Sequence, residues 1–242
     1  MKKLYQKSWH NIDFSSFAIL DSNALADETF YEKFYKIFFT KYNSFDELDN
    51  QWKESKYDTA KEILKLIGNN QKNVLSIGCG IGITEKYIIE HFTNINLIAL
   101  EPSLDALRWL KELEGIQVVN GYFPDALLII QKEINCSVAF ANAIDYVFDN
   151  VQYKLFLRSI IEYGINEFIM ISVSVDKSSF FDNVKQKMKS YLEQIGLYDL
   201  GQFWGYMRTV EEHSTIMIEA GFNVVELVYE NADTIIIKAI IK

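Results

Sequence analysis

Cysteine and histidine are scarce in this sequence, which limits the chemistry that it can carry. Its 242 residues include two cysteines, Cys79 and Cys136, and three histidines, and neither set has the spacing of metal ligands. No metal site is therefore predicted. Two cysteines placed in this way are typical of reduced thiols rather than of a disulfide, and we expect a cytoplasmic location.

Long apolar runs and clustered positive charge are also missing. No stretch approaches the roughly 20 apolar residues that a membrane-spanning helix needs. Residues 1–16 carry lysines without an apolar segment behind them, so they do not resemble a secretory signal. The 24 Lys and Arg are outnumbered by 33 Asp and Glu, which gives a net charge of −9. Since a nucleic-acid surface needs gathered Lys and Arg, we expect neither nucleic acid nor membrane as a partner.

Proline and glycine, at two and eleven residues, are too few to mark a linker between domains. The 49% of hydrophobic residues allows a sizeable core. Residues 1–68 are expected to form a helical N-terminal cap, with a capping box at 44–47 and a helix over 58–67. The aromatic-rich stretch at 29–39 either packs in the core or forms a lid over a pocket. Residues 69–242 form the expected main domain.

The most informative segment is an apolar run that leads into a glycine-rich turn. Residues 73–77 have the pattern of a buried strand, the turn at 78–82 reads GCGIG, and a helical pattern follows over 83–92. The next apolar run, 96–100, ends in Glu101. This combination is typical of a nucleotide-type ligand at the carboxyl ends of parallel strands. The glycines let the backbone come close, and a carboxylate at the second strand end binds ribose hydroxyls.

The glycine spacing distinguishes between families. The third glycine stands one position earlier than in the dinucleotide fingerprint G-x-G-x-x-G. G-x-G-x-G followed by an acid at the second strand end resembles motif I of class I S-adenosylmethionine (SAM)-dependent methyltransferases, of the small-molecule type. The resemblance implies that Gly78, Cys79, Gly80 and Gly82 hold the methionine part of SAM. It also implies that Glu101 binds both ribose hydroxyls.

From residue 73 onward, strand and helix patterns alternate, as in a doubly wound α/β sheet. The pattern predicts strands at 73–77, 96–100, 116–120, 136–141 and 167–174, and helices at 83–92, 103–113, 124–132 and 151–162. After a helix expected at 209–220, two apolar runs, 222–229 and 234–241, flank a turn. We therefore expect a Rossmann-like sheet of seven strands with a C-terminal antiparallel hairpin, which is also the layout that the resemblance implies.

The resemblance assigns the ribose and adenine surroundings to two neighbouring strand ends. Pro102 follows Glu101 at the first of them. After the strand at 116–120, many family members carry an acid that contacts the adenine amino group, whereas this chain has Asn-Gly before Tyr122 and Phe123. The two aromatic side chains either stack on adenine or belong to the core.

After the strand at 136–141, the resemblance places Ala141 and Asn142 beside the methionine part of SAM. Relatives that methylate amino groups of nucleic acids and proteins carry an Asn/Asp-Pro-Pro-aromatic tetrad at this point, and this chain lacks both prolines. The expected acceptor is therefore a small polar metabolite, methylated at oxygen or nitrogen.

Residues 175–208 are expected to form an insertion that shapes the acceptor pocket, with a helix over 180–195 and an aromatic patch at 203–206. Arg208 opens the run RTVEE, which resembles the R-(S/T)-x-x-E run of small-molecule methyltransferases. Two roles stay open for Arg208. It either orients an anionic or carbonyl oxygen of the acceptor, or forms a surface ion pair with a following glutamate.

Methyl transfer is an in-line displacement on a sulfonium, so positioning alone can supply much of the rate. A hydroxyl acceptor would also need a base, for which a neutral histidine is suited. His213 lies in the first turn of the last predicted helix, and His10 lies on the N-terminal arm. Both are candidate catalytic residues, although a lone histidine is more often structural.

The leading hypothesis from the sequence is a SAM-dependent methyltransferase that acts on a small molecule and releases S-adenosylhomocysteine (SAH). Two other functions stay open. One is an NAD-dependent Rossmann oxidoreductase, against which the early third glycine and the terminal hairpin speak. The other is a SAM-binding module without catalysis. The sequence gives no indication of the oligomeric state.

Overall fold

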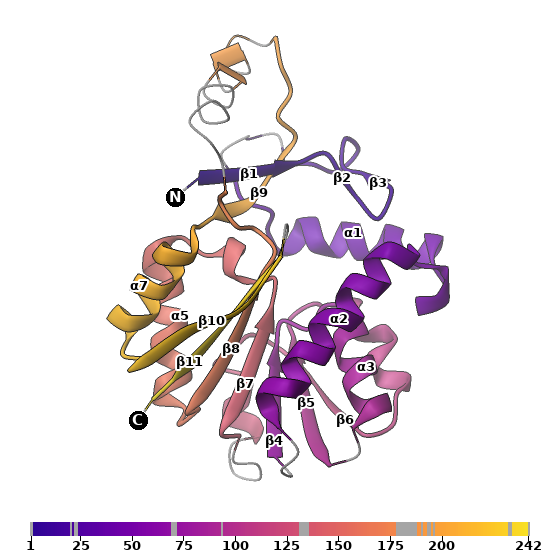
Figure 1. Ribbon diagram of the computed structural model, residues 1–242. Helices are drawn as coiled ribbons and strands as arrows, with labels where there is room; N and C mark the ends of the chain where they lie inside the picture. The colour runs from indigo at the N-terminus through magenta and orange to yellow at the C-terminus, as the bar shows by residue number, and fades with distance from the viewer. Residues whose placement is uncertain are drawn as a thin grey trace.

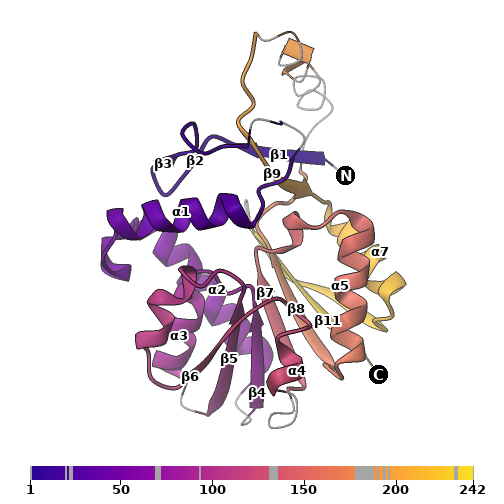
Figure 2. The ribbon, with the colours of Figure 1, turned by 180° about the vertical axis from the view of Figure 1, so that it is seen from behind.

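The computed structural model describes residues 2–19, 21, 24–68, 72–92, 94–130, 136–177, 188–189, 191–192, 195, 197–231 and 234–241. In these residues, helices lie on both faces of a central sheet. A smaller group of N-terminal elements lies across the upper end of that sheet (Figure 1). Figure 2 shows the same three layers and the N-terminal group from behind.

The central sheet has seven strands. They are β4 (Lys72–Ile77), β5 (Ile95–Glu101), β6 (Ile116–Asn120), β7 (Val138–Asn142), β8 (Glu167–Ser172), β10 (Val224–Glu230) and β11 (Ile235–Ile240). Their order is β10-β11-β8-β7-β4-β5-β6, and β11 runs antiparallel to both of its neighbours. The predicted Rossmann-like sheet with a C-terminal antiparallel hairpin is confirmed.

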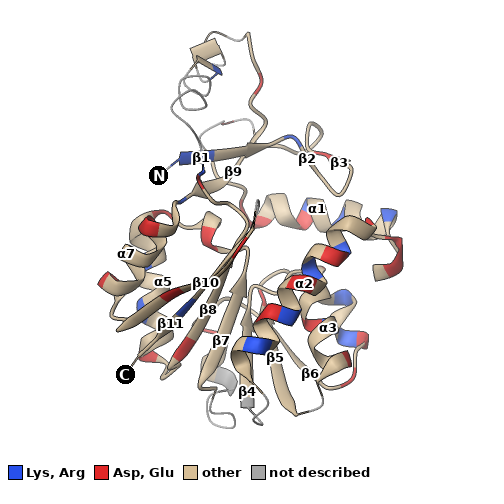
Figure 3. Cartoon of the chain, in the orientation of Figure 1, with Lys and Arg blue, Asp and Glu red and all other residues tan. Residues whose placement is uncertain are grey.

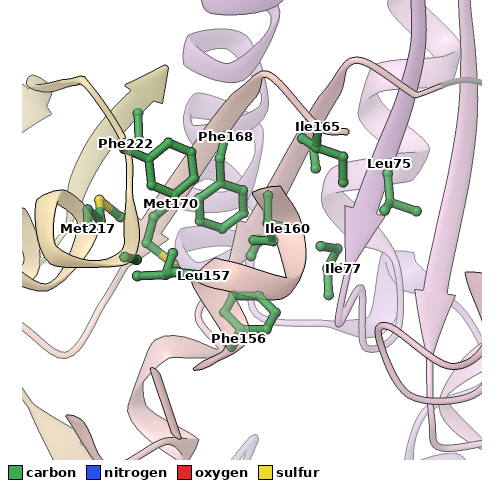
Figure 4. Close-up of a cluster of buried hydrophobic side chains, with 14 of the residues drawn as sticks. Leu75, Ile77, Phe156, Leu157, Ile160, Ile165, Phe168, Met170, Met217 and Phe222 are labelled. Atoms are coloured by element: carbon green, nitrogen blue, oxygen red, sulfur yellow. The ribbon is translucent and has the colours of Figure 1, made fainter. Parts of the chain in front are cut away.

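The apolar runs of the sequence are continuous in the middle strands because both faces of those strands are covered. Leu75, Ala139 and Phe140 have no exposed surface. α2 (Asn50–Ile67) and α3 (Ile83–His91) cover one face, and α5 (Asn150–Glu162) and α7 (Val210–Ala220) cover the other (Figure 1 and Figure 2). Figure 4 shows the core under α5 and α7, which includes Phe156, Leu157, Ile160, Phe168, Met170, Met217 and Phe222.

The predicted helix over 103–113 is wrong as a single α-helix. The segment forms two short 3-10 helices, η2 (Ala106–Arg108) and η3 (Leu110–Glu112). Leu107 and Leu110 are both fully buried. Both leucines pack with Ala99 of β5 in one small core cluster, and two short turns achieve this burial without a continuous α-helix.

The predicted capping box at 44–47 is also wrong. The segment contains a 3-10 helix, η1 (Phe45–Glu47), and Ser44 makes no capping hydrogen bond through its side chain. The Glu47 carboxylate instead accepts a hydrogen bond from the Asn43 backbone N–H at 2.8 Å. α2 begins after Asp49, whose carboxylate accepts from the Trp52 N–H at 2.8 Å, so this helix starts well before the predicted 58–67.

The N-terminal cap is helical only in part. α1 (Glu28–Lys41) and α2 are helices, but β1 (Lys2–Gln6), β2 (Ser8–Trp9) and β3 (Ile12–Asp13) are strands. β1 pairs antiparallel with β9 (Gln202–Met207), which comes from the predicted insertion. The prediction of a helical cap over the whole of 1–68 is therefore wrong for its first residues. The aromatic patch at 203–206 lies in the strand that joins the insertion to the cap.

Two helix predictions reach beyond the described residues. The helix predicted over 180–195 lies mostly outside them. The helix predicted over 124–132 corresponds to α4 (Leu127–Ile130), after which 131–135 are not described.

Within the described ranges, none of the helices combines the length and the apolar surface that a bilayer-spanning helix needs. On α2 and α3, the lysines lie among Asp and Glu rather than in a basic patch (Figure 3).

Candidate functional site

A cavity of about 1070 Å³ lies at the carboxyl ends of β4, β5, β6 and β7, and it is covered by side chains from the cap. This volume is slightly above the roughly 300–1,000 Å³ that small-molecule pockets occupy, so the cavity has room for more than one small ligand. Its wall carries more acidic than basic side chains: Asp27, Glu28, Glu32, Glu101 and Asp105 against Lys36 and Lys56. Such a wall suits a ligand with positive charge.

The glycine-rich turn forms one side of the cavity. Gly78 and Gly82 have φ of 70° and 80°, in the left-handed region that glycine adopts at little cost. A Cβ on Gly78 would lie 2.5 Å from the Ile144 side chain, and one on Gly82 would lie 2.2 Å from Leu110. Both positions therefore require glycine for packing as well as for backbone conformation. The cavity wall includes all four residues predicted here, Gly78, Cys79, Gly80 and Gly82.

Glu101 is the last residue of β5, and its side chain lies beside the glycine-rich turn with 8% of its surface exposed. One carboxylate oxygen accepts a hydrogen bond from the Gly80 N–H and the other from the Ser103 N–H, both at 2.9 Å. Burial raises the pKa of Glu101, while these two backbone hydrogen bonds oppose the rise. Each oxygen keeps acceptor capacity toward the cavity, because a carboxylate offers about four lone-pair sites. The arrangement is compatible with binding a vicinal diol.

The two predicted aromatic residues, which follow the end of β6, have different surroundings. Tyr122 lines the cavity with 55% of its surface exposed. Phe123 also reaches the wall, but its ring packs at 5.6 Å from both Phe156 and Tyr163. Tyr122 is therefore the available stacking surface, and Phe123 belongs mainly to the core. Pro102, also predicted, lines the same part of the wall.

Asn142, at the end of β7, links three elements beside the turn. Its side-chain N–H donates to the Thr84 hydroxyl at 3.0 Å, and its oxygen accepts from the Lys56 ammonium at 3.2 Å. Asn142 lines the cavity, as predicted, whereas Ala141 does not. Ala141 is fully buried in the sheet, so its predicted cofactor contact is wrong, and Ala143 occupies the wall instead.

Lys56 is a wall residue that the sequence reasoning missed. It comes from the cap helix α2, and burial lowers its pKa to about 8. The sequence does contain a sign of this position. Lys56 precedes the buried Ala60 and Ile63 at helical spacing, so a lysine stands on the apolar face of its helix. A charge in such a position is either paired or functional.

Arg208 is a scaffold residue and not part of the cavity wall. It is fully buried and stacks on the Tyr153 ring at 4.9 Å. Its guanidinium donates to the backbone oxygens of Asp145 and Phe148, at 2.9 and 2.5 Å, and to the Asn150 side-chain oxygen at 2.9 Å. These contacts fix η4 (Asp145–Val147) and the start of α5. The predicted role in orienting an acceptor is wrong, because every one of these contacts points into the protein.

His213 also faces inward. It has no exposed surface, its Nδ1 lies 3.2 Å from the Tyr153 hydroxyl, and its Nε2 lies 3.5 Å from a carboxylate oxygen of Asp145. Burial lowers its pKa to about 3, so the imidazole is neutral. The first turn of α7 therefore directs His213 toward α5 and not toward the cavity. The prediction of His213 as a catalytic base is wrong.

His10 is enclosed by aromatic rings of the cap. Its ring centroid lies 4.6 Å from those of Trp9 and Trp52 and 5.4 Å from that of Phe38. Burial lowers its pKa to about 4. The two tryptophans line the cavity and His10 does not, so this predicted base is wrong as well.

The cavity has two ends of different character. The loop end consists of residues 78–82, Glu101 and Tyr122. The aromatic end consists of Trp9, Tyr31, Tyr146 and Trp204. Within the aromatic end, the Trp204 ring centroid lies 5.8, 5.7 and 6.2 Å from those of the other three rings in that order.

The hydroxyls at the aromatic end stay protonated at neutral pH. Burial raises the pKa of Tyr31 well above its usual value and that of Tyr146 to about 12. Gln6 also lines the cavity, and its buried side-chain oxygen has no hydrogen-bond partner. The sequence predicted an aromatic patch that includes Trp204, and it left open whether 29–39 packs in the core or forms a lid. Only the fold brings these segments together.

Comparisons with known proteins bear on the fold. No protein-family model matches the chain, and no curated protein matches it. Among solved structures, a candidate O-methyltransferase from Nostoc punctiforme PCC 73102 matches with a TM-score of 0.59 at 13% identity, over 93% of this chain and 64% of its own. The SAM-dependent methyltransferase SibL matches with a TM-score of 0.57 at 10% identity, over 78% and 55%. Human N-acetylserotonin methyltransferase in complex with SAM matches with a TM-score of 0.52 at 14% identity, over 90% and 60%.

The chain has the fold of SAM-dependent methyltransferases. The resemblance first seen in the glycine-rich turn is confirmed at that level, because the matches extend over most of the chain. The chain spans between half and two thirds of the length of each of these matching structures. At such identities the likeness concerns the fold, and activity has to be argued from the cavity.

Proposed function

We propose that this protein is an enzyme that moves a methyl group from SAM to a nitrogen or oxygen of a small molecule and releases SAH. The observation that carries the proposal is one continuous cavity that combines a loop end suited to an adenosyl group with a separate aromatic end. A fold shared with SAM-dependent methyltransferases supports it. Both ligands have to meet in one cavity for an in-line transfer, and the two ends provide that arrangement.

The residues at the loop end fit the parts of SAM one by one. Glu101 would bind the ribose hydroxyls, the backbone of 78–82 would face the methionine part, and Tyr122 would stack on adenine. When bound, SAM supplies a methyl group activated by a sulfonium. The acidic wall and the nearby ring faces favour a cationic ligand of this kind.

The aromatic end favours an acceptor with a flat apolar surface. Its four rings provide faces and edges for stacking, and the protonated Tyr146 hydroxyl, which accepts a hydrogen bond from the Tyr31 hydroxyl, can donate one to an acceptor. The unpartnered oxygen of Gln6 can accept one from an N–H or O–H of the acceptor. These groups position an acceptor and exclude water from it. They support an acceptor with less polar surface than the polar metabolite that we expected from the sequence.

The wall formed by the described residues contains no histidine, so a hydroxyl acceptor would have to give its proton to one of the wall carboxylates. A neutral amine carries its own nucleophilic lone pair, whereas an alcohol needs a base to remove its proton.

We also propose a cytoplasmic location, because Cys79 and Cys136 are both free thiols.

Calorimetric titration with SAM, SAH and NAD tests the cofactor assignment. We expect SAM and SAH to bind and NAD not to bind. Binding of NAD alone would restore the oxidoreductase hypothesis. SAH release in the presence of paired aromatic amines and alcohols of the same ring system then tests the acceptor. Tight SAM binding with no SAH release across that panel would favour the SAM-binding module without catalysis.

A further inference from the structure

Lys56 is a cation that the cap places inside the cavity. It lies on the face of α2 that also carries the buried Ala60, Ile63 and Ile67, and it contributes to the cavity wall. Its ammonium donates to the Asn142 side-chain oxygen at 3.2 Å and lies 5.8 Å from the Trp52 ring centroid. A lysine in this position is partly removed from water, and its stem follows the apolar face of the helix.

No carboxylate in the described part of the chain forms an ion pair with Lys56. The acid whose field acts on it is Glu85, which is 1% exposed and accepts a hydrogen bond from the Ser76 hydroxyl at 2.5 Å. Burial raises the pKa of Glu85 to about 7, so at neutral pH it is ionised only in part. A desolvated ammonium whose hydrogen-bond partner is a neutral amide is a site for an anion.

The position of Lys56 indicates which anion. Its partner Asn142 is bound in turn to Thr84, in the first turn of α3, directly after the glycine-rich turn. Lys56 therefore reaches the part of the wall that would face the amino-acid portion of SAM. That portion carries the one carboxylate of SAM and of SAH. An ammonium-to-carboxylate contact is a charge-assisted hydrogen bond, which is among the stronger kinds.

We propose that Lys56 binds the carboxylate of the amino-acid portion of SAM and SAH, and that the N-terminal cap thereby takes part in cofactor recognition. This inference rests on the proposed function. Its consequence is selectivity: the protein distinguishes adenosyl ligands that carry an amino-acid carboxylate from those that do not. Without α2, the loop end would bind both classes through the nucleoside alone.

The test compares SAH with 5′-methylthioadenosine, which keeps the adenosine and the sulfur but lacks the amino-acid portion. Both are titrated into wild-type protein and into K56M, whose side chain keeps an apolar stem of similar length. We expect K56M to bind SAH roughly 10- to 100-fold more weakly, the range for hydrogen bonds to charged groups. Its affinity for 5′-methylthioadenosine should change by less than about 3-fold, since that ligand has no carboxylate to lose.

Two further variants separate a binding role from a structural one. K61M changes a lysine on the same helix that is ion-paired with Asp58 outside the cavity, and it should leave both affinities unchanged. K56R keeps the cation and should retain a preference for SAH over 5′-methylthioadenosine. Thermal unfolding of each variant confirms that the fold is intact.

Three outcomes would overturn the inference. Unchanged SAH affinity in K56M would remove the contact. An equal loss for both ligands would make Lys56 a structural residue of the loop end. Wild-type protein that binds neither ligand would overturn the proposed function and this inference with it. If wild type and K56M bind both ligands, and with the same affinities, only this inference is overturned.

Discussion

The loop end and the aromatic end of the cavity are held in place by different forces. The loop end follows the last residues of β4 and β5, whose register is set by backbone hydrogen bonds of the parallel sheet. The aromatic end is held by ring-to-ring packing between α1, β2, β9 and η4. Hydrogen-bonded register fixes positions closely, whereas apolar packing tolerates substitutions that conserve volume. The proposed acceptor surface can therefore change without disturbing the proposed cofactor surface.

The largest expected effect concerns the scaffold behind both ends. Replacing Arg208 by Met removes three hydrogen bonds to η4 and α5 and leaves buried oxygens without donors. We expect a loss of about 4 kcal/mol in the free energy of unfolding, as for other broken buried polar contacts. Urea denaturation measures this. Stability equal to wild type would show that these hydrogen bonds do not hold η4 and α5 in place.

The next effect is a pH dependence beneath the loop end. Burial raises the pKa of Glu85 from 4.5 to about 7. As pH rises from 4.5 to 7, the unfolded chain loses this proton and the folded protein keeps it, so stability falls across that window. The cost above pH 7 is on the order of 3 kcal/mol for a shift of this size. In E85Q this contribution disappears, so urea denaturation at pH 5 and pH 8 should show a flatter profile than wild type. Parallel profiles would contradict the assignment.

A matched glycine pair tests the packing of the turn. Gly82 and Gly115 both have positive φ, at 80° and 83°, but a Cβ meets Leu110 at the first and nothing within 4 Å at the second. G115A should cost about 1 kcal/mol for the backbone conformation alone. G82A adds overpacking and should cost about 2 kcal/mol more. Equal costs in denaturant titrations would show that Leu110 adjusts freely.

Glu101 separates ligand binding from stability at the loop end. Replacing Glu101 by Ala should weaken SAH binding by about 2 kcal/mol, the value of hydrogen bonds to a charged group. Calorimetry measures the change, and adenine, which lacks the ribose diol, serves as the control ligand. If both ligands lose the same affinity, the carboxylate acts on the turn through Gly80 and not on the diol.

The smallest expected effect lies at the aromatic end. Y31F removes one hydroxyl and keeps the ring that packs against Trp204. Because Tyr31 lies outside the loop end, SAH affinity should change by less than about 0.5 kcal/mol. SAH release with an aromatic acceptor should change by more than that. A large loss of SAH binding in Y31F would mean that the two ends are not separable.

Sequence reasoning reached the loop end because its residues are local. A strand, a turn and the next strand end lie within 73–101, and parallel pairing brings consecutive strand ends to one edge of the sheet. The aromatic end was less predictable because the residues that line it come from 2–9, 28–36 and 202–207. These segments meet only in the tertiary fold. Apolar periodicity does not show which helix face meets which partner. His213 and Arg208 were misassigned for that reason, since position along the chain did not reveal that both point inward.

The pairing of β1 with β9 has a consequence for how the chain is made. Lys2 lies opposite Met207, so about 200 residues separate the two partners. During synthesis the first strand leaves the ribosome long before its partner exists, and closing so long a loop is entropically slow. The parallel strands β4 to β8 can assemble in the meantime. Pairing of β1 with β9 is therefore expected to be among the late steps of folding.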